Sequence, residues 1–71
     1  MITATGQIQS KHELMDGMLI SIHATDPVTR TPVTLNMMMS EDAGKEFTRI
    51  NGGKDVMIMV LNAGEGEKKG G

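Results

Sequence analysis

Two segments of the chain alternate between hydrophobic and polar residues, which is the pattern of a β-strand with one buried face. The first is Met18–Thr25 (MLISIHAT), in which every second residue from Met18 is hydrophobic. The second is Val33–Met39 (VTLNMMM), which repeats the alternation. Residues 26–32 (DPVTRTP) contain two prolines and predict a loop between these strands.

A turn before the second strand sets its pairing with the chain that precedes it. Residues 15–17 read MDG, and glycine accepts the positive φ that many tight turns need. A three-residue loop with Gly17 in the left-handed region would pair Leu14 with Met18. This register collects the hydrophobic residues of both strands on one face, and it is the one we predict.

The competing two-residue loop, Asp16–Gly17, would place Glu13 opposite Ile20 and so set charge beside the hydrophobic face. The chosen register also pairs Ile8 with Ala24. It predicts a first strand from about Thr3 to Leu14, polar on its outer side, with Gly6 at a bend or bulge.

A helix is predicted after Ser40, which can serve as its N-cap with two acidic residues in the first turn. Ala43, Phe47 and Ile50 form one hydrophobic stripe at helical spacing. Residues 51–53 (NGG) suit a helix end. Gly44 lies in the helix interior, either as a tolerated surface glycine or at a close approach of another backbone.

The final hydrophobic segment, residues 55–61 (DVMIMVL), does not alternate and predicts a strand covered on both sides. The element order is then β-β-β-α-β. This is a small α+β domain with an antiparallel sheet and one helix packed on one face. Residues 1–61 form the single domain, and residues 62–71 (NAGEGEKKGG) are expected to be a flexible Gly/Glu/Lys tail or a short charged recognition tail.

One helix cannot cover both faces of this sheet, so hydrophobic residues are left over. The second face would carry a contiguous patch formed by Leu19, Met38, Met57, Met59 and Leu61. A patch of that size is typical of an interaction site, and methionine is enriched at adaptable binding surfaces. We expect a homo-oligomer or partner interface here, and the alternative is a strand curvature that folds this face into a barrel-like core.

Composition and charge narrow the class of function. The chain has 71 residues, of which eight are methionine and none cysteine, and its formal net charge is −2. The thin core of so short a chain favours self-association. The charge argues against a nucleic-acid partner, because phosphate binding needs a basic surface. Absent cysteine favours a reducing, cytoplasmic compartment, and we expect neither a signal peptide nor a membrane span.

Few residues are candidates for catalysis or for binding a metal or an anion. His12 is expected on the inner face and His23 on the outer face, so they would not share a metal. The serines lack the surroundings of an activated nucleophile. A backbone anion site could form at residues Asn51, Gly52, Gly53 and Lys54 beside Arg49, although the phosphate-loop pattern is absent. We expect no cofactor, no metal and no catalytic residues, and therefore no enzyme.

The hairpin GQIQSKHELMDGMLISI, with VTLNM, SEDAGKEF and VMIMVL after it, resembles the small accessory proteins from the early region of lambda-like phages. The likeness lies in size, style and the SKxELxDG hairpin; it runs from Gly6 to Leu61 and covers most of the predicted domain. It implies a non-enzymatic phage protein that acts by binding in the host cytoplasm, often as an inhibitor of a host or defence factor.

Two functional interpretations follow. The first is a homo-oligomeric protein-binding protein whose Met-rich face engages an unidentified partner. The second is a nucleotide or nucleic-acid ligand module, with its site between subunits near Arg49 and Lys54.

Overall fold

The computed structural model describes residues 2–64 and contains four strands and one helix. The elements are β1 (Ile2–Leu14), β2 (Gly17–Thr25), β3 (Pro32–Met39), α1 (Glu41–Asn51) and β4 (Val56–Val60). The predicted order β-β-β-α-β and the α+β class are confirmed, and every predicted element lies within two residues of its observed bounds.

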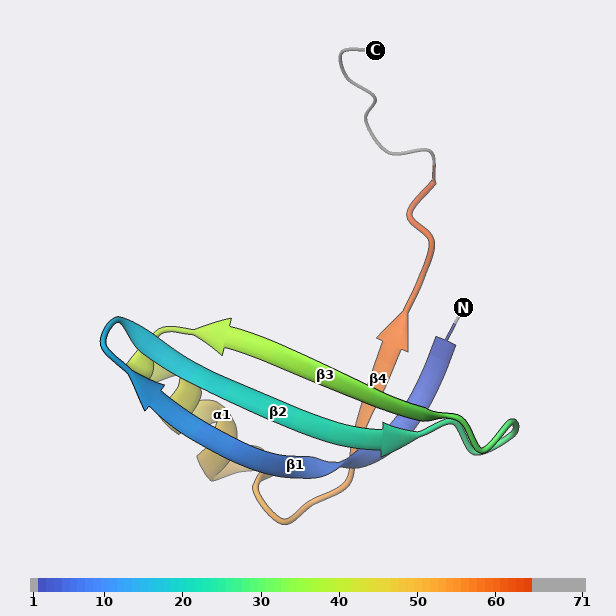
Figure 1. Ribbon diagram of the computed structural model, residues 1–71, viewed down its shortest axis with the longest axis horizontal. Helices are drawn as coiled ribbons and strands as arrows, with labels where there is room; N and C mark the ends of the chain where they lie inside the picture. Colours follow the sequence, from blue (N-terminus) through green and yellow to red (C-terminus); the bar gives the residue numbers. More distant parts are fainter. Residues whose placement is uncertain (1, 65–71) are drawn as a thin grey trace.

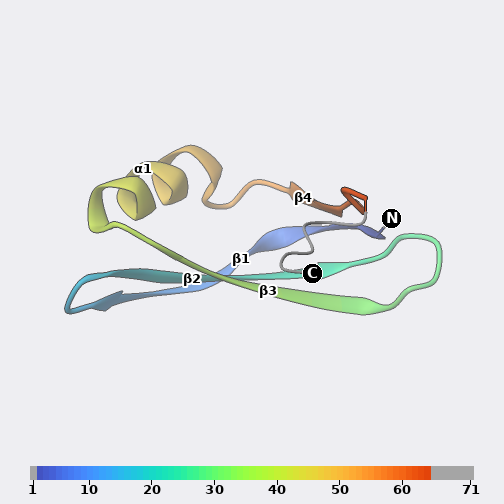
Figure 2. The ribbon, with the colours of Figure 1, turned by 90° about the horizontal axis from the view of Figure 1, so that it is seen from above.

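The four strands form one antiparallel sheet in the order β3-β2-β1-β4 (Figure 1). β1 is the long strand that joins the two parts of the sheet, because it pairs with β2 over most of its length and with β4 over Ile2–Gly6. Helix α1 lies on one face of the sheet, at the end near the β1–β2 turn (Figure 2). We call this the helix face and the opposite side the outer face.

The predicted register of the first hairpin is wrong. Leu14 pairs with Gly17 and Glu13 with Met18, so the loop has two residues, Met15 and Asp16. Gly17 is the first residue of β2 and is not among the residues with positive φ. The hairpin does contain one residue without a partner on the opposite strand, but this residue is Gln9 of β1 and not a residue of the turn.

This β-bulge between Ile8 and Ser10 reverses the side-chain alternation of β1. Ile8 pairs with Ile22 on the helix face, but beyond the bulge Lys11 pairs with Ile20. The helix face of β1 therefore changes from hydrophobic to charged halfway along the strand. An unbroken alternation, which our register assumed, could not produce this change.

The core lies on the helix face of the sheet, where α1 covers one end and the paired β1 and β4 supply side chains at the other. Its buried side chains come mainly from β2, and they are Ala4, Met18, Ile20, Ile22, Ala24 and Ile58. Seven half-buried hydrophobic residues pack around them, including Phe47 of α1. No polar or charged side chain is buried within the described residues.

Gly44 is the point where the helix meets the sheet. It is buried, and a Cβ atom built on it would lie 2.7 Å from Sδ and 2.9 Å from Cβ of Met18. The surface-glycine interpretation is therefore wrong, and the close neighbour is a side chain rather than a backbone. Because the helix turns Gly44 and Phe47 toward the sheet, Ala43 and Ile50 of the predicted stripe remain exposed.

The predicted N-cap is confirmed. Ser40 has extended backbone angles and its Oγ accepts a hydrogen bond from the backbone N–H of Ala43 at 3.2 Å. Glu41 and Asp42 lie in the first turn, where the helix dipole favours acidic residues.

β4 is not covered on both sides as predicted. It is an edge strand, and only Ile58 is buried, whereas Met57 and Met59 on the outer face are 62% and 56% exposed. Residues 62–64 have no regular secondary structure, and the rest of the predicted tail lies outside the described residues.

Gly6 provides a test of this geometry. A Cβ atom at this position would overlap the backbone carbonyl of His23 and the Cα of Ala24. We expect Gly6→Ala to lower the free energy of unfolding by at least about 2 kcal/mol, because β1 and β2 would have to separate. Urea unfolding measures the loss, with Thr5→Ala as the neighbouring exposed control. A loss for Gly6→Ala no larger than that of the control would contradict the register.

Candidate binding surfaces

The residues predicted to form one hydrophobic patch lie at opposite ends of the outer face. Leu19 pairs with Met38 near the β1–β2 turn. Met57 pairs with Thr5, which also pairs with Thr25. The level of Met57 is therefore six positions along β2 from Leu19, a distance of about 20 Å.

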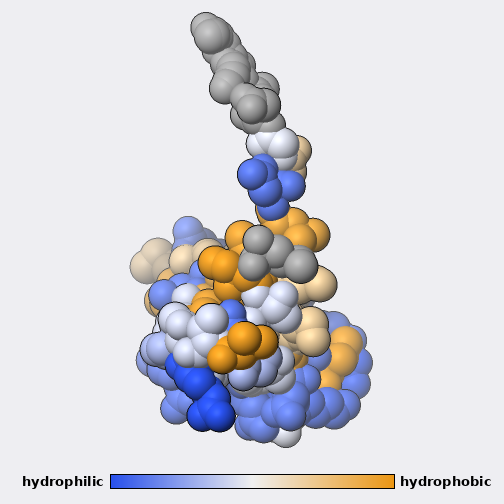
Figure 3. Space-filling view, turned by 90° about the vertical axis from the view of Figure 1, so that its right-hand side faces the viewer, coloured by the Kyte–Doolittle hydropathy of each residue, from blue (hydrophilic) through white to orange (hydrophobic). Residues whose placement is uncertain are grey.

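The prediction of one contiguous patch is therefore wrong. The separation depends on the order of the strands in the sheet, which was not predicted from the sequence. Leu61 follows β4 and is 63% exposed, beside the methionine end of the sheet. Figure 3 views the molecule from the side of the β2–β3 loop, and hydrophobic side chains gather in its upper part, where β4 and the start of β1 lie.

The outer face carries no Asp, Glu, Lys or Arg on any strand. This follows from the register, which places the following residues of the four strands on that side: Thr3, Thr5, Gln7, Ser10, His12, Leu14, Leu19, Ser21, His23, Thr25, Thr34, Asn36, Met38, Met57 and Met59. Charged residues make up 23% of the chain, and within the described part they lie in the loops, on α1 and on the helix face of β1. The centre of the face is polar but uncharged, and Ser21 Oγ donates a hydrogen bond to Asn36 Oδ1 at 2.6 Å.

The two histidines share this outer face, contrary to the prediction that His12 lies on the inner face. The bulge at Gln9 moves His12 to the outer face, opposite Leu19. His23 lies four residues farther along β2, or about 13 Å away. No group of three His, Cys, Asp or Glu side chains suited to a metal occurs within residues 2–64.

The predicted anion site uses backbone groups that already have partners. The N–H of Gly52 donates to the carbonyl of Thr48 at 2.8 Å, and that of Lys54 donates to Asn51 at 3.0 Å. Gly52 is the C-cap of α1, with an extended backbone, and Gly53 follows it in the left-handed region with φ of 76°. The turn therefore acts as a helix cap, and anion binding there stays a prediction.

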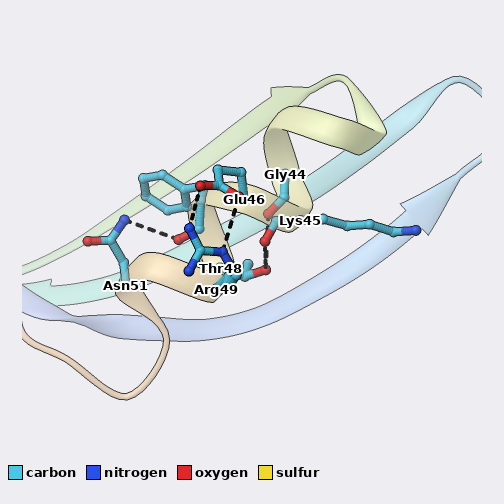
Figure 4. Close-up of polar contacts among 7 residues, drawn as sticks. Gly44, Lys45, Glu46, Thr48, Arg49 and Asn51 are labelled. Atoms are coloured by element: carbon cyan, nitrogen blue, oxygen red, sulfur yellow. Dashed lines mark hydrogen bonds and ion pairs between the residues drawn. The ribbon is translucent and has the colours of Figure 1, made fainter.

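Arg49 is directed to an acidic side chain of its own helix. Its Nε donates to Glu46 Oε1 at 3.1 Å, and its terminal nitrogen donates to the other carboxylate oxygen (Figure 4). This hydrogen bonding raises the pKa of Arg49 and lowers that of Glu46. Both side chains are largely exposed, so the pair adds little to stability.

A shallow hollow beside α1 contains both signs of charge. It is lined by Lys11 and Glu13 of β1 and by Lys45 and Arg49 of α1, among others. Lys45 pairs with Glu41 at 3.1 Å; that hydrogen bond raises the pKa of Lys45, and Glu13 adds a smaller electrostatic contribution. Because carboxylates lie close to these cationic side chains, the hollow is not a basic patch.

A larger groove of about 490 Å³ was not predicted from the sequence. It runs between β4, the end of α1 and the helix face of β2 and β3, and its lining includes Ile22, Leu35, Met37 and Phe47. The groove depends on the strand order, and no local pattern in the sequence reports it.

Comparison with models of known protein families, with curated proteins and with solved structures finds no match. No helix within residues 2–64 is long and apolar enough to cross a membrane.

Inorganic pyrophosphate tests the anion site. We expect the amide resonances of Gly52 and Lys54 to stay unmoved in a pyrophosphate titration followed by NMR, because both N–H groups already donate to carbonyl oxygens. A saturable shift of both resonances that Arg49→Ala removes would contradict this expectation.

Proposed function

We propose that the protein is a small non-enzymatic binding protein that self-associates and engages a protein partner through the outer face of its sheet. The observation that carries the proposal is that the strands place no charged residue on that face, although the loops and the helix of the same chain are rich in charged residues. Charged residues are depleted at the centres of protein interfaces.

The chemistry of the face supports this use. Covering a charged side chain costs much more free energy than covering a hydroxyl or amide that finds a hydrogen-bond partner. Ser, Thr, Asn and Gln both donate and accept, so they can match a partner of varied polarity. Met38 at one end and Met57 at the other, 59% and 62% exposed, are flexible hydrophobic contacts at the rim.

The resemblance to early-region phage proteins supports the choice of partner. It favours a bacterial host or defence factor, met in the cytoplasm of the host cell and inhibited by the binding. None of the described titratable side chains is buried, whereas catalytic acids and bases commonly lie in buried sites.

Lysine substitutions at the centre of the face test the proposal. His23 and Thr34 are paired, exposed residues of β2 and β3. We expect the double variant His23→Lys, Thr34→Lys to weaken partner capture from bacterial lysate at least about tenfold, because two charges would be buried.

Val28→Lys is the matched control, because Val28 is 86% exposed in the β2–β3 loop, away from the face. Circular dichroism establishes that all variants are folded. Equal capture by the double variant, the control and the wild type would disprove the assignment of the outer face.

A further inference from the structure

The large groove follows the free edge of β4. Residues from both faces of this strand line it, Val56 and Ile58 from the helix face and Met57 and Met59 from the outer face. A hollow that contacts both faces of one strand must run along an edge of that strand. Because the other edge is paired with β1, the groove lies along the unpaired edge of β4.

An unpaired strand edge beside a hydrophobic floor is suited to an added strand. The backbone N–H and C=O groups of such an edge supply hydrogen bonds, and the floor receives alternate side chains. Here the floor contains the buried Ile22 and the partly covered Leu35 and Phe47. The occupant is therefore expected to be an extended hydrophobic segment.

The other open edges carry features that discourage pairing, and β4 does not. The second half of β1 carries the bulge at Gln9 and the charged residues Lys11 and Glu13. β3 begins with Pro32, which has no N–H, and has Thr34 and Asn36 on its outer side. β4 (VMIMV) has no charge, proline or bulge, and only its length of five residues limits pairing.

The sequence of β4 identifies the occupant. Val56-Met57-Ile58-Met59-Val60 reads the same in both directions. A two-fold symmetric interface requires a surface that complements itself. Two antiparallel copies of β4 centred on Ile58 would place each residue opposite an identical residue type, with the outer face of one sheet continuing into the other.

The flanking charge favours the antiparallel arrangement. Asp55 precedes β4 and accepts a hydrogen bond from Gln7 Nε2 at 3.0 Å, so it is held at one end of the strand. Parallel pairing in register would set two Asp55 carboxylates side by side. The antiparallel register places Asp55 opposite the uncharged Leu61 of the second copy.

We propose that β4 is a homodimerisation strand, which pairs with the β4 of a second copy along this groove. The proposal rests on the proposed self-association and states where the two chains meet. It extends the two four-stranded sheets into one sheet of eight strands and leaves most of the outer face free for a different partner.

Introduced cysteines test the strand and its register together, because the chain has no cysteine of its own. In the proposed register Met57 is opposite Met59 of the second copy, with Cα atoms about 4.5–5.5 Å apart, within the range of a disulfide. The two Met57 positions are displaced by two residues, about 8 Å apart, which is beyond that range.

A mixture of Met57→Cys and Met59→Cys chains should therefore yield at least about five times more cross-linked dimer than either chain alone after oxidation. A mixture of Thr34→Cys and Asn36→Cys chains, at the same spacing on the β3 edge, is the control and should yield only background. Equal cross-linking by both mixtures, or none by the first, would overturn the proposed strand pairing.

Sedimentation of the wild type separates this failure from that of the broader proposal. A monomer at about 100 μM would overturn self-association and the β4 dimer together, since even a weak pair forms there. An oligomer that survives Met59→Lys, with no Met57–Met59 cross-link, would overturn the β4 dimer alone.

Discussion

The packing of one short helix on one half of one sheet face determines the rest of this molecule. The helix approaches closely because Gly44 has no side chain, and Met18 fills the space beneath it. Met18 and Ile20, the largest fully buried side chains, each contribute about 1.5–3 kcal/mol by burial. An eleven-residue helix covers only part of the helix face, so the groove beside β4, the outer face and the free edge of β4 remain open.

These open surfaces differ in chemistry, and the difference suggests two kinds of contact. The outer face is polar and free of formal charge, which suits a partner that docks flat against it. The free edge of β4 is hydrophobic and lies along a groove, which suits a strand. A domain of this size buries too little surface to be very stable alone, so partners that bind only the folded chain also stabilise it.

The sequence alone was sufficient to predict the helix and the four strands, because each of them depends on local signals. Alternation located β2 and β3, and Ser40 located the start of the helix. The register of the first hairpin could not be predicted, because the bulge at Gln9 has no local signature and the choice assumed that hydrophobic residues stay on one face. The prediction of a contiguous patch was wrong for a related reason, because the separation of Leu19 from Met57 depends on the pairing of β4 with the far side of β1.

Amide hydrogen exchange at increasing protein concentration tests the central claim, that the surfaces left open by the helix are completed by other chains. The exchange of alternate amides in Val56–Val60 should slow as the concentration rises, whereas the amides on the free side of β3 should exchange at a constant rate. Exchange in β4 that is independent of concentration, at levels where the protein sediments as an oligomer, would contradict the account.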